Sequence, residues 1–193
     1  MKKTFSFLAG LTLAGLLACG GGSKNDNKTP QAPAELQYTD PVGPSYKLVK
    51  NSTRSTGNKL VLELWGPTNT TQLTGRGVYF GLTADVSKVT FVKVDMYDDE
   101  LVQNVAFDLG NEEPKLLKSV MDGNTLRVLV SQKGTGREQR LDQALARIAL
   151  QIQPNVARDT TISLSIADNA RVLPYVSDGS TPITIAVGTL AYR

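Results

Sequence analysis

Histidine is absent from the 193 residues, and cysteine occurs once, as Cys19. Without histidine, neither a Ser-His-Asp nor a Cys-His catalytic arrangement can be built. Beyond Cys19 no thiol is available for a disulfide, a nucleophile or a thiolate zinc site. A Gly-x-x-x-x-Gly-Lys-Ser/Thr loop, which would hold a nucleotide phosphate, is also missing. We therefore expect a protein that is not an enzyme and that has no resident cofactor apart from the calcium alternative considered below.

Charge of one sign is not in excess. Lys and Arg number 21 and Asp and Glu number 18, for a formal net charge of +3. Lys2 and Lys3 belong to an N-terminal segment that we expect to be removed, and without them the net charge is about +1. Binding to nucleic acid requires a clustered basic face, so we expect no nucleic-acid partner.

The N-terminus carries an apolar run that is too short to cross a membrane. Lys2 and Lys3 precede Phe5–Leu17, which spans about 13 residues where a membrane helix needs about 20. The run closes with Leu16-Leu17-Ala18-Cys19, which resembles the lipobox of a bacterial lipoprotein signal. The resemblance implies a signal peptide over residues 1–18 and membrane contact through a lipid on Cys19. The alternative, a buried thiol in an uncleaved apolar helix, would require packing that the following Gly20–Lys28 segment cannot provide.

Residues 19–44 have the composition of a tether. Glycines and small polar residues favour flexibility in its first half, and four prolines stiffen its second half. Gly20 stands where an aspartate often signals retention at the inner membrane, so the lipoprotein resemblance favours the outer membrane of the bacterial envelope. In a Gram-positive source the anchor would instead lie on the outer face of the plasma membrane. We expect residues 45–193, roughly 150 residues, to form one domain with a single core.

From Lys59 onward, short runs of alternating apolar and polar residues are separated by turn residues. Leu60, Leu62 and Leu64 share one parity, and Asp122-Gly123-Asn124 is a strong turn signal. About nine such runs occur, at spacings typical of an antiparallel β-sandwich or jelly roll. The sequence therefore predicts an all-β domain with a single sandwich.

Three segments are less clear. Between Lys88 and Met96 the apolar residues change parity, which predicts one long strand with a β-bulge. Arg137–Ala149 has apolar residues at helical spacing, and we expect a helical turn or loop that runs into a strand. Pro114–Met121 fits either a strand or a helix.

Several segments together resemble the cohesin family and its carbohydrate-binding-module-like relatives. Gly77–Asp85, followed by Val89–Val94, is similar to a glycine-led cohesin strand, an aspartate turn and a second strand. Asp122–Val130, Asp142–Ile152 and Thr161–Asp168 are similar to later cohesin strands. The resemblance implies a nine-stranded jelly roll with a binding role, since cohesins bind dockerins through one sheet face. No recognition residue of the family can be carried over to this sequence, and a single copy on a lipid anchor departs from a scaffoldin.

One acidic cluster offers a metal site. Asp95, Asp98 and Glu100 could supply some of the six to eight oxygen ligands that calcium takes. The alternative is a solvated hairpin turn. Asp98 and Asp99, adjacent in a turn, could not readily frame a glycosidic bond as a catalytic pair must.

Aromatic residues are few, at 6% of the chain. Trp65, Tyr79 and Tyr97 are the candidates for a glycan or partner contact, because rings can stack on the apolar faces of sugars. The alternative for Trp65, which precedes Gly66-Pro67, is a ring that caps the edge of the core.

Taken together, the sequence predicts a lipid-anchored, non-catalytic binding module of the bacterial envelope. It would present a β-sandwich to a protein or polysaccharide partner. The alternative is an accessory structural subunit of a larger membrane or cell-surface assembly.

Overall fold

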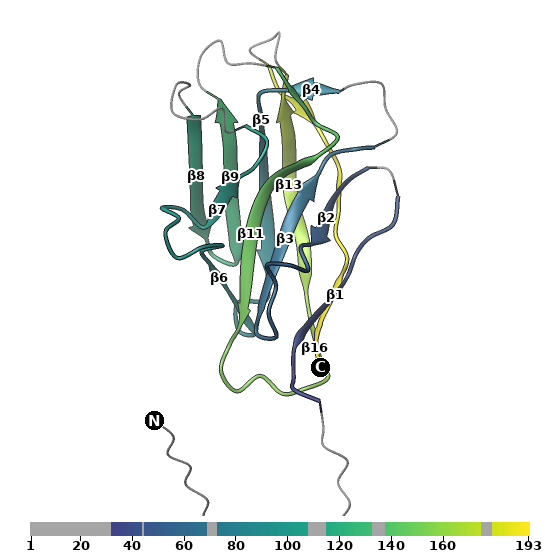
Figure 1. Cartoon of the computed structure of the whole chain (residues 1–193), viewed down its shortest axis with the longest axis vertical. Helices are drawn as coiled ribbons and strands as arrows, with labels where there is room; N and C mark the ends of the chain where they lie inside the picture. Colours follow the sequence, from purple (N-terminus) through teal and green to yellow (C-terminus); the bar gives the residue numbers. More distant parts are fainter. Residues whose placement is uncertain (1–31, 44, 69–72, 108–114, 133–137, 175–178) are drawn as a thin grey trace, which may run out of the picture. The chain divides into compact units, whose positions relative to one another are not determined.

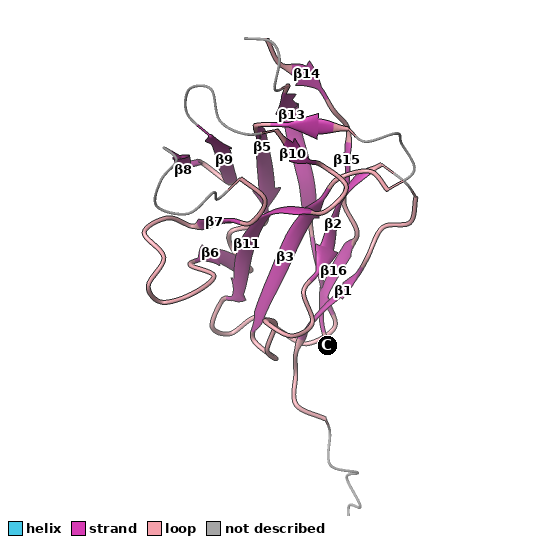
Figure 2. Cartoon of the chain, turned by 45° about the horizontal axis from the view of Figure 1, so that its top comes forward, coloured by secondary structure: helices cyan, strands magenta, loops and turns pink. Residues whose placement is uncertain are grey.

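The computed structural model describes residues 32–43, 45–68, 73–107, 115–132, 138–174 and 179–193. Within these ranges the chain forms strands, turns and bends, and no helix (Figures 1 and 2). The strands are β1 (Leu36–Thr39), β2 (Tyr46–Lys50), β3 (Lys59–Trp65), β4 (Thr74–Gly75), β5 (Gly77–Ala84), β6 (Val89–Val92), β7 (Val102–Asn104), β8 (Lys115–Asp122), β9 (Thr125–Gln132), β10 (Gln139–Arg140), β11 (Ala144–Ile152), β12 (Thr160–Ile162), β13 (Leu164–Leu173), β14 (Thr181–Pro182), β15 (Ile185–Ala186) and β16 (Thr189–Tyr192). The described part of the chain holds no helix that is long and apolar enough to span a bilayer.

Two large sheets form the sandwich. One has the order β15-β2-β3-β11-β6, with β7 also pairing with β11, and the other has the order β14-β13-β5-β9-β8 (Figure 2). All pairings are antiparallel except that of β15 with β2. The predicted all-β sandwich is therefore confirmed. A three-stranded sheet with the order β1-β16-β12 and the two-stranded sheet β10-β4 accompany the two large sheets.

The core lies between the two sheets, where the alternating residues of each strand meet. Leu60, Leu62 and Leu64 of β3 are fully buried, and they belong to the same cluster as Phe80 and Leu82 of β5. Burial of such a side chain stabilises the fold by about 1.5–3 kcal/mol. The alternation in the sequence thus identifies the core side of both sheets.

Strand β3 is also covered on its other side. Val61 packs with Val94 and Ala149 in a second small cluster. Val94 lies beyond the end of β6, so the chain leaves the sheet after Val92 and folds back over its outer face. The Nζ of Lys59 donates to the carbonyl of Val94 at 2.6 Å, which holds this segment down. The predicted bulged strand over 88–96 is therefore wrong, because the change of parity marks a chain that crosses to the outer face.

The other two ambiguous segments are strands where the structure describes them. Lys115–Asp122 is β8, and it pairs with β9 along its whole length. Residues 138–149 contain β10, bends at residues 141–143 and the first part of β11, so the predicted loop that runs into a strand is confirmed, and the alternative helical turn is not formed in these residues. A register shift in β11 between Ala144 and Ala146 accommodates the irregular start of this strand.

The folded domain begins earlier than the boundary at residue 45 that the sequence predicts. Leu36 and Tyr38 are buried, and β1 pairs with β16 from Leu36 opposite Tyr192 to Thr39 opposite Thr189. The prolines around this strand gave it the composition of a linker, but its two apolar residues alternate as in an ordinary edge strand. Residues 1–31, which include the expected signal peptide and Cys19, lie outside the described residues.

Tyr38 joins this first strand to the C-terminal segment. Its hydroxyl donates to the carbonyl of Leu48 at 3.2 Å and accepts from the backbone N–H of Gly188 at 2.7 Å. Gly188 is required at this point, because a Cβ there would overlap the carbonyl oxygen of Thr39. Burial raises the pKa of Tyr38 to about 12, although the hydrogen bond from Gly188 opposes the rise.

Removing the Tyr38 hydroxyl should therefore destabilise the domain. We expect Tyr38→Phe to lower the free energy of unfolding by about 1–3 kcal/mol, because the buried carbonyl of Leu48 and the partly buried N–H of Gly188 both lose a partner. The folded pKa lies above the ordinary value of 10.0, so the stabilisation is complete below pH 10 and is lost as the pH rises toward 12. Urea unfolding at pH 8 and pH 11 measures both effects. The exposed Tyr97, as Tyr97→Phe, is the control, and equal losses in the two variants would contradict the assignment.

Candidate functional site

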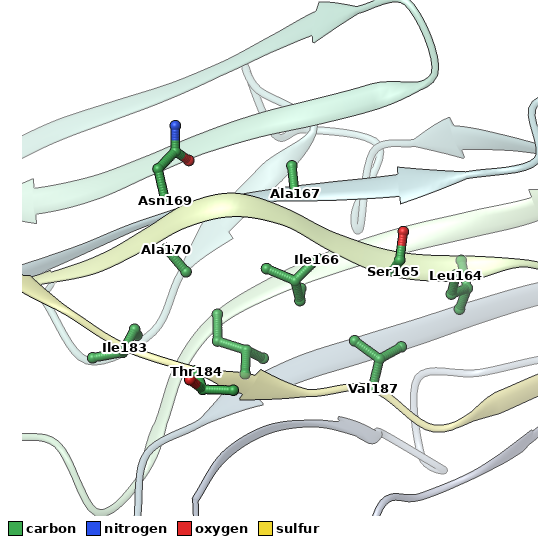
Figure 3. Close-up of a pocket in the computed structure, with 10 residues that line it drawn as sticks. Leu164, Ser165, Ile166, Ala167, Asn169, Ala170, Ile183, Thr184 and Val187 are labelled. Atoms are coloured by element: carbon green, nitrogen blue, oxygen red, sulfur yellow. The ribbon is translucent and has the colours of Figure 1, made fainter.

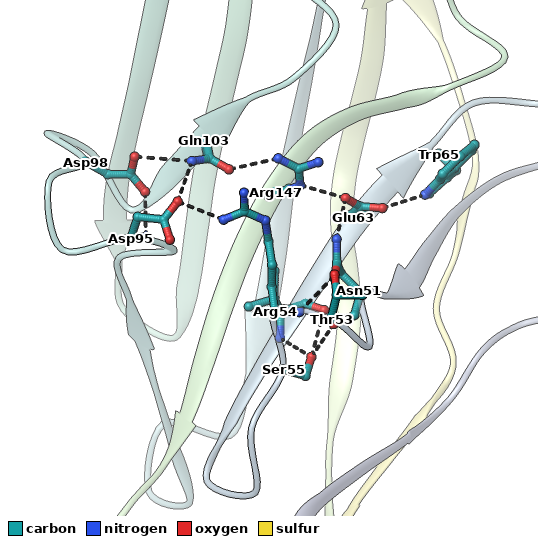
Figure 4. Close-up of polar contacts among 11 residues, drawn as sticks. Asn51, Thr53, Arg54, Ser55, Glu63, Trp65, Asp95, Asp98, Gln103 and Arg147 are labelled. Atoms are coloured by element: carbon teal, nitrogen blue, oxygen red, sulfur yellow. Dashed lines mark hydrogen bonds and ion pairs between the residues drawn. The ribbon is translucent and has the colours of Figure 1, made fainter.

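A buried carboxylate organises the outer face of the six-stranded sheet. Glu63 on β3 is 7% exposed and accepts three hydrogen bonds (Figure 4). They come from Arg147 Nε on β11 at 2.6 Å, Asn51 Nδ2 at 2.8 Å and Trp65 Nε1 at 3.0 Å. Glu63 and Arg147 are directly opposite in the register of the two strands, so the sheet itself sets this ion pair.

The network continues from Arg147 toward the loop after β6. Arg147 NH1 donates to Gln103 Oε1 at 3.1 Å, and Gln103 Nε2 donates to Asp95 Oδ2 at 3.0 Å (Figure 4). Arg54 NH1 also donates a hydrogen bond to Asp95 Oδ2, at 2.8 Å. Asp98 accepts from the backbone N–H of Asp95 at 2.8 Å. Together these bonds fix two loops to the sheet.

The charges in this network are compensated. Burial raises the pKa of Glu63, but hydrogen bonds from Arg147, Asn51 and Trp65 outweigh it and the net effect lowers the pKa. The hydrogen bond from Gln103 lowers the pKa of Asp95, with a further contribution from Arg54. Both carboxylates are thus held ionised by donors. A general acid would need a raised pKa, so the network has the properties of a structural element.

The structure separates the three residues that were predicted as calcium ligands. Glu100 turns toward β8, where its Oε2 accepts from Ser119 N at 2.9 Å and Ser119 Oγ at 2.6 Å. Asp95 and Asp98 remain in the network described above. Among the residues that the structure describes, no group of three or more acidic side chains is arranged to hold a metal ion. The described geometry offers calcium no ligand set of the predicted kind.

The three aromatic candidates lie in three different places. Trp65, half-buried, belongs to the network on the outer face of the six-stranded sheet. Tyr79 is on β5 of the other sheet and points outward, because its neighbours Val78 and Phe80 are in the core. Tyr97 is 89% exposed in the loop after β6. The structure therefore does not bring Trp65 and Tyr79 to one platform.

The outer face of the second sheet has a different character. We use the term β8–β9–β5 face for its outward-pointing residues, which are Leu116, Lys118, Val120 and Asp122 of β8, Thr125, Arg127 and Leu129 of β9, and Tyr79 and Thr83 of β5. Polar contacts between side chains of neighbouring strands hold several of these side chains in place. Arg127 pairs with Asp122 at 2.8 Å and donates to the Tyr79 hydroxyl at 3.4 Å, and the Thr83 and Thr125 hydroxyls lie 2.7 Å apart.

Within this sheet, exposed large apolar side chains lie on β8. Leu116 is 37% exposed and Val120 is 48% exposed, and both point outward from the β8–β9–β5 face. Met121, at the rim of the same strand, is 41% exposed. Lys118 and Arg127 add positive charge between and beside the apolar residues. An apolar patch bordered by polar side chains is typical of a protein–protein contact.

A hollow of about 430 Å³, with both apolar and neutral polar side chains in its lining, lies at the opposite edge of the same sheet (Figure 3). Its walls are Leu164, Ile166 and Ala170 of β13 and Ile183 and Val187 of the C-terminal segment. Here β13 changes register against β5 between residues 167 and 171. Among the residues that the structure describes, no charged side chain lines this hollow.

Two of these features were missed in the sequence. The outward apolar residues of β8 fell in the segment that fitted either a helix or a strand. Glu63 and Arg147 each sit inside an apolar run, and a charge at such a position indicates a buried ion pair. That signal could have identified both residues, although not their pairing, because 84 positions separate them.

Comparisons with known proteins show a fold similarity. No protein-family model matches the sequence, and no curated protein matches it. Among solved structures, the chain is similar to the sixth cohesin of scaffoldin B from Acetivibrio cellulolyticus, solved in complex with a mutant Cel5 dockerin. The identity is 12%, with 77% of this chain and 97% of that chain covered and a TM-score of 0.55. A type II cohesin from the cellulosome of the same organism gives 9% identity, 76% and 94% coverage and a TM-score of 0.52. The domain thus has the cohesin β-sandwich fold.

Proposed function

We propose that this chain is a non-catalytic, protein-binding module that is held at the bacterial envelope by a lipid on Cys19. The module presents the β8–β9–β5 face to a folded protein partner. The observation that carries the proposal is the pair of outward, exposed apolar residues Leu116 and Val120 on β8, with Lys118 between them.

The contrast between the two outer faces supports this choice. The six-stranded sheet is covered by its own chain, through Val94 and the ion-paired network around Glu63. The β8–β9–β5 face has no such cover among the described residues. It is a regular surface of three long strands, which suits a partner with a flat or gently curved contact. Binding energy at such surfaces comes mainly from a few central side chains.

The fold similarity is consistent with a protein partner. One of the similar cohesins was solved in complex with a dockerin. We infer a partner of the same general kind, a folded protein domain, without carrying over any recognition residue. The partner's own contact surface should be apolar where it meets Leu116 and Val120, and polar around that point, because Arg127 and Lys118 are already paired with Asp122 and Glu100.

An affinity capture tests the function. The tagged, full-length protein is purified from detergent-solubilised envelope, and bound protein and bound glycan are both identified. We expect one dominant protein that is recovered in a fixed ratio to the bait. Recovery of polysaccharide without a protein, or of free monomer alone, would contradict the proposal.

The anchor is tested by replacing the lipid-accepting residue. We expect Cys19→Ser to move most of the protein from the membrane fraction to the soluble fraction, because an acyl chain supplies the membrane affinity in this proposal. Fractionation followed by immunoblotting measures the shift. A wild-type protein that incorporates labelled fatty acid, beside a variant that does not, gives the chemical control. A variant that stays with the membrane would contradict the lipid anchor.

A further inference from the structure

A second hollow, of about 390 Å³, opens where the edges of the two sheets meet beside β7 and β8. It lies within the size range of small-molecule sites. The loop after β6 forms one wall, β7 forms another, and β8 and β11 each contribute one side chain. The lining residues are Tyr97, Asp98, Asp99, Val102, Gln103, Asn104, Leu117 and Arg147.

The polar groups of this hollow are held in place before any ligand arrives. Arg147 is fixed by its bonds from Nε to Glu63 and from NH1 to Gln103. Its remaining amino group, NH2, has no partner among the described residues. Gln103 is fixed at both ends of its amide, by Arg147 on one side and by Asp95 and Asp98 on the other. Binding would therefore cost little side-chain ordering at these two residues.

The rim adds groups of a different kind. Tyr97 presents a ring that is 89% exposed at the rim, so its face is open to a ligand. Asp99 is exposed and makes no hydrogen bond or ion pair with the other residues that the structure describes, so its carboxylate is available to accept hydrogen bonds. The floor contains Val102 and Leu117, which are apolar. A ligand here would meet a ring face, apolar carbon, carboxylates, amides and a guanidinium.

We propose that this hollow binds a neutral pyranose sugar, as a site separate from the β8–β9–β5 face. A sugar ring has an apolar face that stacks on an aromatic ring, here Tyr97, and hydroxyls that bond to planar polar groups. Adjacent hydroxyls can accept from Arg147 and donate to Asp98 or Asp99. Asp98 and Asp99 would repel an anionic ligand. The positive charge of Arg147 does not offset this repulsion, because it is already compensated by Glu63. The absence of a convergent acidic cluster in the described part disfavours a metal ion.

Saturation-transfer NMR on the full, acylated chain in a sugar-free detergent tests the site. The probes are glucose, mannose, galactose and N-acetylglucosamine, with glucuronate as the anionic comparison. We expect at least one neutral sugar to bind with a Kd in the millimolar range, which is typical of so small a ligand, and more tightly than glucuronate. Absence of transfer from all four neutral sugars, or preferential binding of glucuronate, overturns the proposal.

Variants locate the binding on the molecule. We expect Tyr97→Ala and Asp99→Asn each to weaken sugar binding about tenfold or more, which corresponds to the loss of one stacking or hydrogen-bonding contact. Both residues are exposed, so the fold should be retained, and the unfolding midpoint checks this. Tyr79→Ala, on the other sheet, is the matched control and should bind sugar as the wild type does. Equal losses in Tyr79→Ala and Tyr97→Ala, or no loss in either, overturn the assignment. Sugar binding should persist when Leu116 and Val120 are replaced, which keeps this test separate from that of the protein partner.

Discussion

Replacing Leu116 and Val120 together by aspartate should reduce capture of the protein partner at least about 100-fold, since each tenfold loss needs only about 1.4 kcal/mol. Both side chains point away from the core on β8, so the free protein should tolerate the change. In the complex, two carboxylates would be removed from water without partners, and this costs several kcal/mol in total. Quantitative capture from solubilised envelope measures the loss.

A matched control adds the same charge elsewhere. Gln37 on β1 and Gln151 on β11 are exposed, and neither belongs to the β8–β9–β5 face. The variant that combines Gln37→Asp with Gln151→Asp should capture the partner as well as the wild type does. Circular dichroism and the unfolding midpoint establish that both double variants are folded. If the control loses the partner as completely as the β8 variant, net charge and not the β8–β9–β5 face governs binding.

Glu63→Ala should cause the largest loss of stability among single substitutions on the outer face of the six-stranded sheet. Its side chain is 10% exposed and that of Arg147 is 21% exposed. Removing one partner of a buried ion pair typically costs about 3–5 kcal/mol, because the other charge is left without compensation. We expect a loss near about 3 kcal/mol in chemical unfolding, since Arg147 keeps some contact with water and with Gln103.

A paired replacement separates the ion pair from simple packing. The double variant Glu63→Leu with Arg147→Met should recover most of the stability, because apolar residues of similar size can replace a buried pair. The pH dependence gives a second check. The pKa of Glu63 is lowered below its ordinary value of 4.5, so its stabilisation is present above pH 4.5 and is lost as the pH falls through the folded-state value. The double variant should therefore lose less stability below pH 4.5 than the wild type. A Glu63→Ala loss below about 1 kcal/mol, as for an exposed pair, would contradict this account.

The core could be predicted from the sequence because the alternation of apolar and polar residues within a single strand shows which of its side chains face the core. Leu60, Leu62 and Leu64 alternate with other residues, and the structure buries all three completely. The same rule fails where a strand has adjacent apolar residues, as in Leu116-Leu117 of β8, since no parity is then distinguished. Strand β1 does alternate, but the prolines around it have the composition of a linker and concealed the strand. Strand pairing, rather than composition, defines these two elements.

The candidate site was predicted less well, for a geometrical reason. The parity of a strand shows that Trp65 and Tyr79 point away from the core, but it does not show which sheet each strand joins. The structure puts them in different sheets, so they cannot form one surface. The acidic residues Asp95 and Glu100 are near in sequence, yet Glu100 bonds to Ser119 on β8. The separation of Trp65 from Tyr79 and that of Glu100 from Asp95 both follow from the way strands distant in sequence are arranged. That arrangement cannot be deduced directly from one sequence.

Site-specific photo-crosslinking in living cells tests the central claim most directly. A photoreactive amino acid is placed at Val120, on the edge strand β8 of the β8–β9–β5 face, and separately at Gln151 on the other sheet. The account predicts one discrete crosslinked protein from position 120, absent from position 151 and lost when Leu116 is also replaced by aspartate. A crosslink from position 151 alone, or none from either position with the protein at its normal level in the envelope, would contradict it.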